Sequence, residues 1–104
     1  MVVNFELNGQ QFMGLNGGPH FTFNEAVSFV VECDTQEEID YFWNKLTVGG
    51  SESMCGWLKD KYGVSWQIVP RILGQLMADA NRSQRVVQAF MKMKKFDIDT
   101  LLKA

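Results

Sequence analysis

The stretch AVSFVVECDTQEEIDYFWNKL, residues 26–46, decides the fold, because its pattern changes from that of a strand to that of a helix within a few residues. From Ala26 to Cys33 the side chains alternate between two faces, as in a β-strand. One face would carry Val27, Phe29, Val31 and Cys33, and the other Ala26, Ser28, Val30 and Glu32. The first face is apolar and the second partly polar, so we expect a strand that packs on one side.

A helix should begin directly after this strand. Thr35 and Glu38 stand at the spacing of a capping box, in which a hydroxyl and a carboxylate accept hydrogen bonds from the free amides of a helix start. Apolar residues then recur at helical spacing and form a single stripe: Ile39, Phe42, Trp43 and Leu46. We expect Gly49-Gly50 to end the helix.

The residues before this stretch predict a β-hairpin. Val3, Phe5 and Leu7 alternate with polar residues, and Asn8-Gly9 follows at once, a pair that favours the type I′ turn. Residues 11–16 would return as the partner strand. Glycines and a proline at positions 17–19 then break the pattern.

The residues after the helix predict two more strands and a helical tail. Met54–Lys59 and Val64–Val69 have strand patterns, and a turn that ends at Gly63 separates them. Apolar residues at helical spacing follow Pro70, in the groups Ile72, Leu73, Leu76 and Met77, then Val86, Val87, Phe90 and Met91, then Ile98, Leu101 and Leu102, with Asp97 as an N-cap. The predicted class is α+β, with residues 1–104 forming a single domain.

Composition narrows the class of protein. The chain has 104 residues, 46% of them hydrophobic, and no run of apolar residues long enough to span a membrane. The N-terminus does not have the pattern of a signal peptide. Two cysteines, Cys33 and Cys55, are too few for a disulfide framework, so we expect a cytoplasmic protein that is not bound to a membrane.

Charge is unevenly distributed along the chain. Residues 1–58 contain eight acidic side chains and one lysine, whereas residues 59–104 contain nine basic and four acidic ones. The basic set of the tail consists of Arg82, Arg85, Lys92, Lys94 and Lys95, but apolar residues are interspersed with it and the pI is about 5.3. We therefore expect complementary protein surfaces and no nucleic-acid partner.

Common catalytic patterns are not found. The chain has one histidine, His20, which excludes zinc sites of the Cys₂His₂ kind, and its glycines match no phosphate-binding loop. A nucleophilic pair of His20 with Cys33 or Cys55 has no specific support. Cys33 is expected in the core, and Cys55 is the better candidate for a reactive thiol.

Two stretches carry a family resemblance. FELNGQQFMGLNGGPHF, residues 5–21, and CGWLKDKYGVSWQIVP, residues 55–70, resemble the PhnB-like family, as does the tail MKMKKFDI at 91–98. This family belongs to the glyoxalase/bleomycin-resistance, or vicinal oxygen chelate, superfamily, and its members are often labelled 3-demethylubiquinone-9 3-methyltransferase domains.

The resemblance implies a fold of paired βαβββ modules around a cavity. Residues 26–69 resemble one complete module, residues 2–16 resemble the last two strands of the other, and residues 71–104 form the helical tail. Without the first module's opening strand, helix and strand, strand edges and an apolar face would be exposed. We expect a homodimer to cover them; the alternative is that Met1 is an internal or misassigned start.

Metal ligands of the superfamily, usually His and Glu, line the cavity. By the resemblance, Ser28 and Gln67 stand at two of these positions, and Gly14 or Asn16 falls near another. Neither serine nor glutamine contributes charge to a divalent ion, so a metal site is disfavoured and no cofactor is expected.

The expected function is therefore binding of an unknown, partly apolar small molecule in a sheet-lined cavity. Its candidate lining residues are Ser28, Cys55, Trp57, Gln67 and His20. The alternative is an enzyme of the vicinal oxygen chelate type, similar to glyoxalases, dioxygenases or resistance proteins and dependent on metal through other ligands. The methyltransferase label has no support in the sequence itself.

Overall fold

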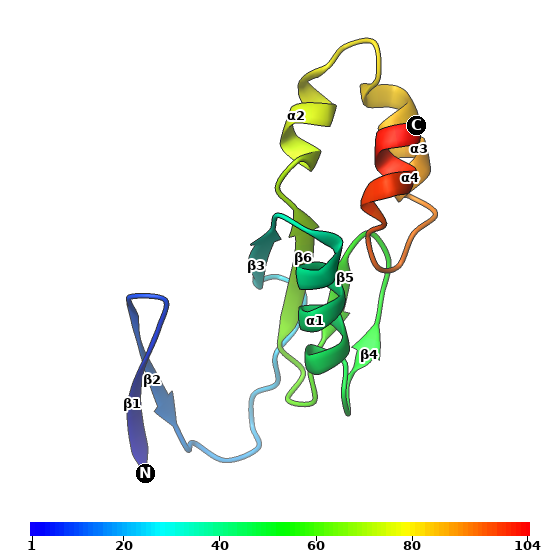
Figure 1. Ribbon diagram of the computed structural model, residues 1–104. Helices are drawn as coiled ribbons and strands as arrows, with labels where there is room; N and C mark the ends of the chain where they lie inside the picture. Colours follow the sequence, from blue (N-terminus) through cyan, green and yellow to red (C-terminus); the bar gives the residue numbers. More distant parts are fainter.

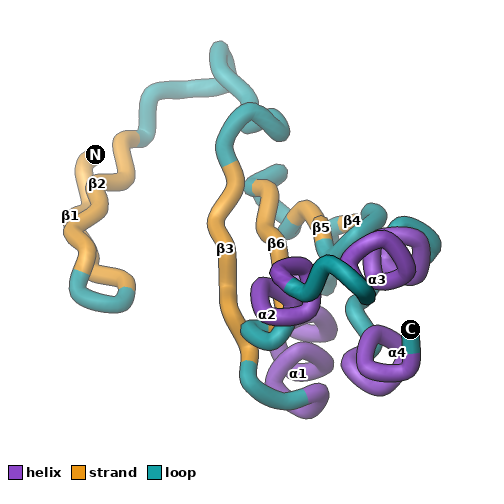
Figure 2. The backbone as a smooth tube through the Cα atoms, turned by 90° about the horizontal axis from the view of Figure 1, so that it is seen from above, coloured by secondary structure: helices purple, strands orange, loops and turns teal.

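The computed structural model describes residues 1–104 and has two regions, a hairpin and a larger body (Figures 1 and 2). In the body, β3 (Ser28–Cys33) leads into α1 (Gln36–Leu46), followed by β4 (Ser51–Glu52), β5 (Trp57–Lys59) and β6 (Ser65–Pro70). The four strands form one sheet in the order β3-β6-β5-β4. β3 is parallel to β6, and the other neighbours are antiparallel. This is the βαβββ module, so the expected fold class is confirmed.

Strand β3 is shorter than expected. It begins at Ser28 and not at Ala26, because the Asn24 side chain accepts a hydrogen bond from the Ala26 amide at 2.9 Å and holds a turn there. The division into two faces is as expected at the strand's C-terminal end, where Cys33 is fully buried and Glu32 is exposed.

The N-terminus of α1 forms as the sequence predicts. The Thr35 hydroxyl accepts a hydrogen bond from the Glu38 amide at 3.2 Å, while the Glu38 carboxylate accepts one from the Asp34 amide. The predicted end at Gly49-Gly50 is wrong. α1 ends at Leu46, since Thr47 donates its hydroxyl to the Trp43 carbonyl at 2.7 Å and caps the last turn.

The expected strand Met54–Lys59 is also shorter in the structure. It begins at Trp57 because Cys55 and Gly56 have positive φ values of 59° and 82°, which a strand does not allow. Their amides donate to the carbonyls of Met93 and Lys94, both at 2.8 Å, and not to a neighbouring strand. The two-residue strand β4 was not expected from the pattern, because alternation is undetectable over two positions.

The tail folds into α2 (Leu73–Ala78), α3 (Ser83–Phe90) and α4 (Ile98–Lys103). Asp97 caps α4, as predicted, by accepting a hydrogen bond from the Thr100 amide at 3.2 Å. α3 carries Val86 into the core, and α2 does the same with Leu76.

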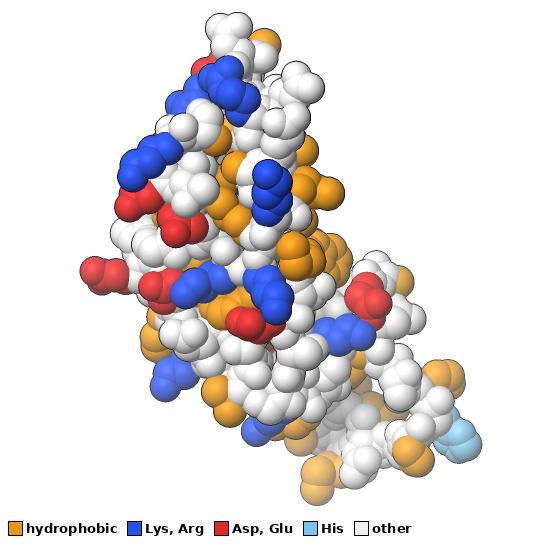
Figure 3. Space-filling model, turned by 90° about the vertical axis from the view of Figure 1, so that its right-hand side faces the viewer, with side chains coloured by type: hydrophobic (Ala, Val, Ile, Leu, Met, Phe, Trp, Pro, Cys, Tyr) orange, Lys and Arg blue, Asp and Glu red, His pale blue; other side chains and the backbone are white.

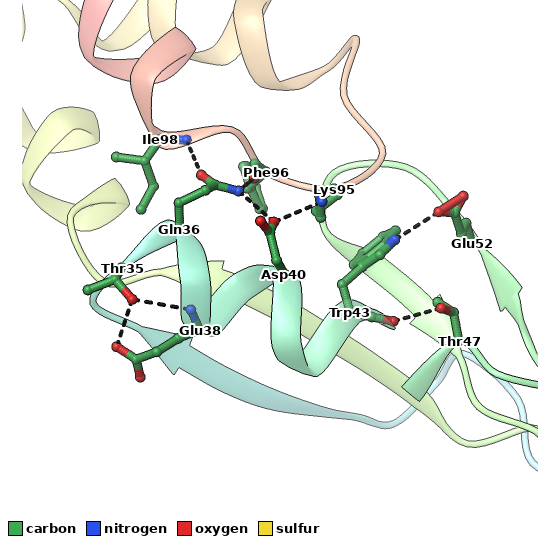
Figure 4. A network of polar contacts seen from close by, with 10 residues as sticks. All are labelled: Thr35, Gln36, Glu38, Asp40, Trp43, Thr47, Glu52, Lys95, Phe96 and Ile98. Carbon is green, nitrogen blue, oxygen red and sulfur yellow. Dashed lines mark hydrogen bonds and ion pairs between the residues drawn. The ribbon is translucent and has the colours of Figure 1, made fainter. Parts of the chain in front are cut away.

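Side chains of α1 connect the tail to the module (Figure 4). The Gln36 amide donates to the Phe96 carbonyl at 2.9 Å and accepts from the Ile98 amide at 2.8 Å. One turn later, Asp40 forms an ion pair with Lys95 at 2.8 Å. These contacts link residues 55 to 62 positions apart and hold the segment that leads into α4 against α1.

The hydrophobic core lies between α1, one face of the sheet and the tail. Its members are buried apolar side chains: Cys33, Ile39, Trp43, Leu58, Ile68, Leu76, Val86, Phe96 and Leu101. Because the core draws on both the module and the tail, we treat residues 28–104 as one body.

The N-terminal hairpin consists of β1 (Val2–Leu7) and β2 (Gln10–Leu15), which form a separate two-stranded sheet. Asn8 and Gly9 have φ values of 49° and 82°, so the predicted turn with positive φ at both central residues is confirmed. Every residue of β1 is exposed. Residues 16–27 connect the hairpin to β3 without a helix or strand.

None of the helices is both long enough and apolar enough to cross a lipid bilayer.

Candidate functional site

The candidate site lies on the sheet face opposite α1. Trp57 is paired with Gln67 across β5 and β6, and Gln67 is paired with Val30 across β6 and β3. Two residues further along each strand, Lys59 is paired with Ser65, and Ser65 with Ser28. Paired residues point to the same face of a sheet, and so do residues two apart, so all of these side chains share one face.

Two of the candidate residues are in direct contact. The Gln67 Nε2 donates a hydrogen bond to the Ser28 Oγ at 2.9 Å, between two half-buried side chains. The parallel pairing of β3 with β6 makes this contact, since the residues are 39 positions apart in the chain. A third candidate, Trp57, lies beside Gln67 on the neighbouring strand.

These residues do not fit the metal site of the superfamily. A neutral hydroxyl and a neutral amide that bond each other offer a divalent cation neither charge nor a free pair of strong ligands. No group of three or more His, Cys, Asp or Glu side chains lies close enough together to hold a metal ion.

A small pocket opens beside Trp57 on the same face. It has a volume of about 270 Å³, and only two of its eight lining residues, Trp57 and Leu58, are hydrophobic. The polar and charged lining consists of Glu25, Ser51, Glu52, Ser53, Lys59 and Ser65. We call this space the Trp57 pocket.

Two features of the Trp57 pocket stand out. The Ser65 side chain is 1% exposed, and its hydroxyl has no hydrogen-bond partner. At the rim, Lys59 of β5 forms an ion pair with Glu25 of the connecting segment at 2.5 Å. The hydrogen bond and positive charge of Lys59 lower the pKa of the Glu25 carboxyl below its ordinary value.

Of the five candidates, only Trp57 lines this pocket; Ser28 and Gln67 lie on the same sheet face outside it, and Cys55 and His20 lie elsewhere. Cys55 lies in the turn before β5, with its sulfur 3.8 Å from the sulfur of Met91. His20 is an exposed residue of the connecting segment. Neither lines the Trp57 pocket.

Cys33 lies in the core, as its pattern suggests. It is fully buried, and burial raises the pKa of its thiol above the ordinary value, with Glu38 and Asp34 adding to the effect. Because the neutral thiol is favoured, Cys33 is a poor nucleophile.

A second, larger cavity of about 650 Å³ lies between the hairpin and β3. A row of aromatic rings runs along it, in which Phe5 stacks on Phe12 at 5.6 Å, Phe12 meets Phe29 at 6.0 Å, and Phe29 meets Trp66 at 5.3 Å. Phe5 and Phe29 remain 43% and 39% exposed. We call these four residues the aromatic row.

Comparison with known proteins identifies the family. Residues 1–69 match the family model described as 3-demethylubiquinone-9 3-methyltransferase. The chain belongs to this family. Its resemblance to PhnB-like proteins is thereby confirmed.

Solved structures agree with this family assignment. The chain is similar to the PhnB protein from Bacillus cereus, with 41% identity over 67% of this chain and a TM-score of 0.61. The matched region spans 64% of the length of that protein. Protein PA1353 from Pseudomonas aeruginosa shares the fold, with 20% identity, a TM-score of 0.54, and coverage of 67% of this chain and 62% of its own. A search of the curated proteins gives no match.

Seven of the eight residues that line the Trp57 pocket are not among the predicted site residues, and three of these seven supply its ion pair and its buried hydroxyl: Glu25, Lys59 and Ser65. Ser65 and Lys59 follow from strand alternation, two residues from Gln67 and Trp57 respectively, so the pattern contained this information. Glu25 lies in a segment without periodicity, and no sequence signal connects it with Lys59.

Proposed function

We propose that the chain is a dimeric module that binds a small, partly apolar molecule on the sheet face around Trp57 without a catalytic metal. The hydrogen bond between Gln67 and Ser28 is the observation that carries this proposal. It fills the two positions where the superfamily's metal ligands are expected with a neutral pair joined by a hydrogen bond. The tryptophan wall and the polar groups beside it suit a ligand with both apolar and polar parts.

Metal analysis tests the proposal. Protein purified without chelator should contain zinc, nickel and iron well below one ion per chain, and native mass spectrometry of the same sample should detect a retained small molecule. A stoichiometric metal would contradict the proposal and favour the enzymatic alternative. The double variant Ser28→His, Gln67→Glu is the matched control, because it restores a nitrogen and a carboxylate ligand and should bind added zinc more tightly than the natural chain.

A second copy of the chain is the partner that we propose for the hairpin. A two-stranded hairpin is marginally stable by itself, and here Val3, Phe5 and Leu7 are between 43% and 52% exposed. The hairpin has two free strand edges, and β3 is an unpaired edge of the larger sheet. A two-fold dimer can cover both the edges and the aromatic row with the same surface from each copy.

Sedimentation velocity tests the dimer. We expect a dimer at micromolar concentration, and the double variant Phe5→Ser, Phe12→Ser should shift the chain towards the monomer. Gln10→Ser, on the same hairpin but outside the aromatic row, is the control and should leave the mass unchanged. A natural chain that is a monomer would refute the dimer and leave the proposed ligand site untouched.

The family's description names a methyltransferase, and we propose that this chain does not transfer methyl groups. Its glycines do not match the glycine-rich loop of a typical methyl-donor enzyme. Calorimetric titration with S-adenosylmethionine should give no binding heat, and saturable binding would reopen the enzymatic interpretation.

We further propose a cytoplasmic protein without a nucleic-acid partner. Both cysteines are free thiols, which supports a reducing compartment. On the face drawn in Figure 3, acidic and basic side chains are interspersed, and pairs such as Lys95 with Asp40 neutralise part of the basic tail. Retardation of DNA that weakens with salt would contradict this proposal.

A further inference from the structure

The lining of the Trp57 pocket contains one lysine, Lys59, and two carboxylates, Glu25 and Glu52. Lys59 and Glu25 bond each other there, but their side chains are 41% and 62% exposed. Exposed ion pairs contribute little to stability, so little opposes the exchange of this contact for contacts with a ligand. A ligand that carries both charges can replace both halves of the pair at once.

Inside the pocket, Ser65 supplies an unused polar group. Its hydroxyl is buried and has no partner, although buried polar groups are nearly always hydrogen-bonded. Ser51 and Ser53 add two more hydroxyls to the lining. The other acidic group, Glu52, already accepts a hydrogen bond from the Trp43 indole at 2.8 Å. Besides the hydroxyls of Ser51 and Ser53, the pocket therefore offers a ligand the ammonium group of Lys59, the carboxylate of Glu25 that is paired with it, and the buried hydroxyl of Ser65.

The size and walls of the pocket limit the ligand. A volume of about 270 Å³ equals the space of about nine water molecules, which suits a molecule the size of a free amino acid. The Trp57 ring supplies an apolar wall for a side chain.

We propose that the Trp57 pocket binds a small zwitterion of the α-amino acid class. Lys59 pairs with the ligand's carboxylate, Glu25 pairs with its ammonium group, and the Ser65 hydroxyl donates a hydrogen bond to the carboxylate. The inference rests on the proposed function, because it names the ligand class of the same sheet face. The ion pair between Glu25 and Lys59 ties the connecting segment to β5 beside the pocket.

Titration monitored by NMR tests the ligand class. The probes are L-phenylalanine and L-alanine, each compared with an analogue that lacks the amine (3-phenylpropanoate, propanoate) and one that lacks the carboxylate (2-phenylethylamine, ethylamine). At least one amino acid should shift the signals of Trp57, Lys59 and Ser65, and its two analogues should bind at least tenfold more weakly. The inference would be overturned if the analogue that lacks the amine bound as tightly as the amino acid. It would also be overturned if neither amino acid shifted any signal at millimolar concentration.

Charge-removing variants test the two contacts separately. Lys59→Gln and Glu25→Gln should each weaken binding of the amino acid about tenfold or more, the size expected for a lost hydrogen bond to a charged group. Lys61→Gln, an exposed lysine outside the pocket, is the matched control and should bind as the natural chain does. Unchanged affinity in both pocket variants would contradict the assignment.

Ser65→Ala separates a ligand contact from a structural role. Removing a buried hydroxyl without a partner should leave the melting temperature equal or higher, while affinity for the amino acid falls. A variant that is less stable and binds equally well would show that Ser65 acts only in the fold.

The outcome for the ligand class can be separated from the outcome for the proposed function. A retained molecule that is not a zwitterion, with NMR shifts confined to Ser28 and Gln67, would overturn the ligand class and leave the binding module standing. Failure of both requires that native mass spectrometry finds no retained molecule and that no probe shifts the sheet face.

Discussion

The hairpin and the body use similar strands and reach opposite states of burial. β1 alternates apolar and polar residues in the same way as β3, yet every residue of β1 is exposed, whereas β3 carries Cys33 into the core. The difference is the presence of a covering layer: α1 covers one face of the body's sheet and the tail adds side chains to the same core, whereas little of the chain covers the hairpin. A strand pattern therefore specifies local shape, while burial by distant residues provides most of the stability.

The largest expected contrast is between core substitutions in the two regions. Ile68→Ala should lower the free energy of unfolding by about 2–5 kcal/mol, because Ile68 is fully buried and its truncation leaves a cavity. Phe5→Ala, measured on protein dilute enough to be monomeric, should cost less than about 1 kcal/mol, since Phe5 is already 43% exposed. Urea unfolding of both variants measures the two values; equal losses would mean that the hairpin is an integral part of the core.

Two glutamines provide a smaller contrast. Gln36→Ala removes the hydrogen bonds to Phe96 and Ile98 that connect α1 with the tail, and should cost about 1–3 kcal/mol. Gln11→Ala removes an exposed contact to Glu6 in the hairpin and should change stability by less than about 0.5 kcal/mol. Hydrogen exchange of α4 provides a second readout, because faster exchange is expected only in the Gln36 variant.

The next contrast is between the N-cap of α1 and the turn of the hairpin, which both depend on residues close together in the chain. Thr35→Ala removes the N-cap of α1 and should destabilise the body by about 1 kcal/mol. Gly9→Ala strains a turn with φ of 82° by about 1–2 kcal/mol, but this strain should disturb the hairpin and leave the unfolding midpoint of the body nearly unchanged. Loss of stability of the body in the Gly9 variant would show that the two regions unfold together.

The smallest expected effect is the dependence on pH of the ion pair between Asp40 and Lys95. A hydrogen bond from Lys95, with help from Gln36, lowers the pKa of Asp40 below its ordinary value of 3.8. The unfolded chain therefore binds a proton at higher pH than the folded chain, so this contribution to stability is present above pH 3.8 and is lost as pH falls through the lower folded pKa.

Partial exposure of both side chains keeps this contribution small. Urea unfolding between pH 5 and pH 2 checks the effect. The free energy of unfolding of the Asp40→Asn variant should fall less steeply over this range than that of the natural chain. Parallel curves for the two proteins would contradict the assignment.

Most of the elements could be predicted from the sequence, and the errors lie at the ends of elements: local hydrogen bonds shift the start of β3 and the end of α1, whereas distant contacts shift the start of β5. The hairpin turn, the N-cap of α1 and the cap of α4 all depend on residues fewer than five positions apart, and each is confirmed. The start of β5 was wrong because the backbone there pairs with the carbonyls of Met93 and Lys94, more than 35 positions away. Sequence spacing does not reveal such contacts.

The residues of the candidate site also divide into those that sequence patterns indicate and those that only a distant contact adds. Alternation places Ser65 and Gln67 on one face, and the family resemblance indicates Ser28 and Gln67. Glu25, in the connecting segment, belongs to the site only through its ion pair with Lys59. Cys55 was expected at the cavity, but the turn that contains it directs its sulfur towards Met91.

The sequence by itself determined the order of strands and helices, their caps and turns, and the family to which the chain belongs. These features follow from contacts between near neighbours and from the pattern of apolar residues. The tertiary structure decided which distant residues meet: Ser28 with Gln67, Gln36 with Phe96, and Glu25 with Lys59. Such contacts form only when long segments close on one another, and the free energy for closing them comes from the shared core.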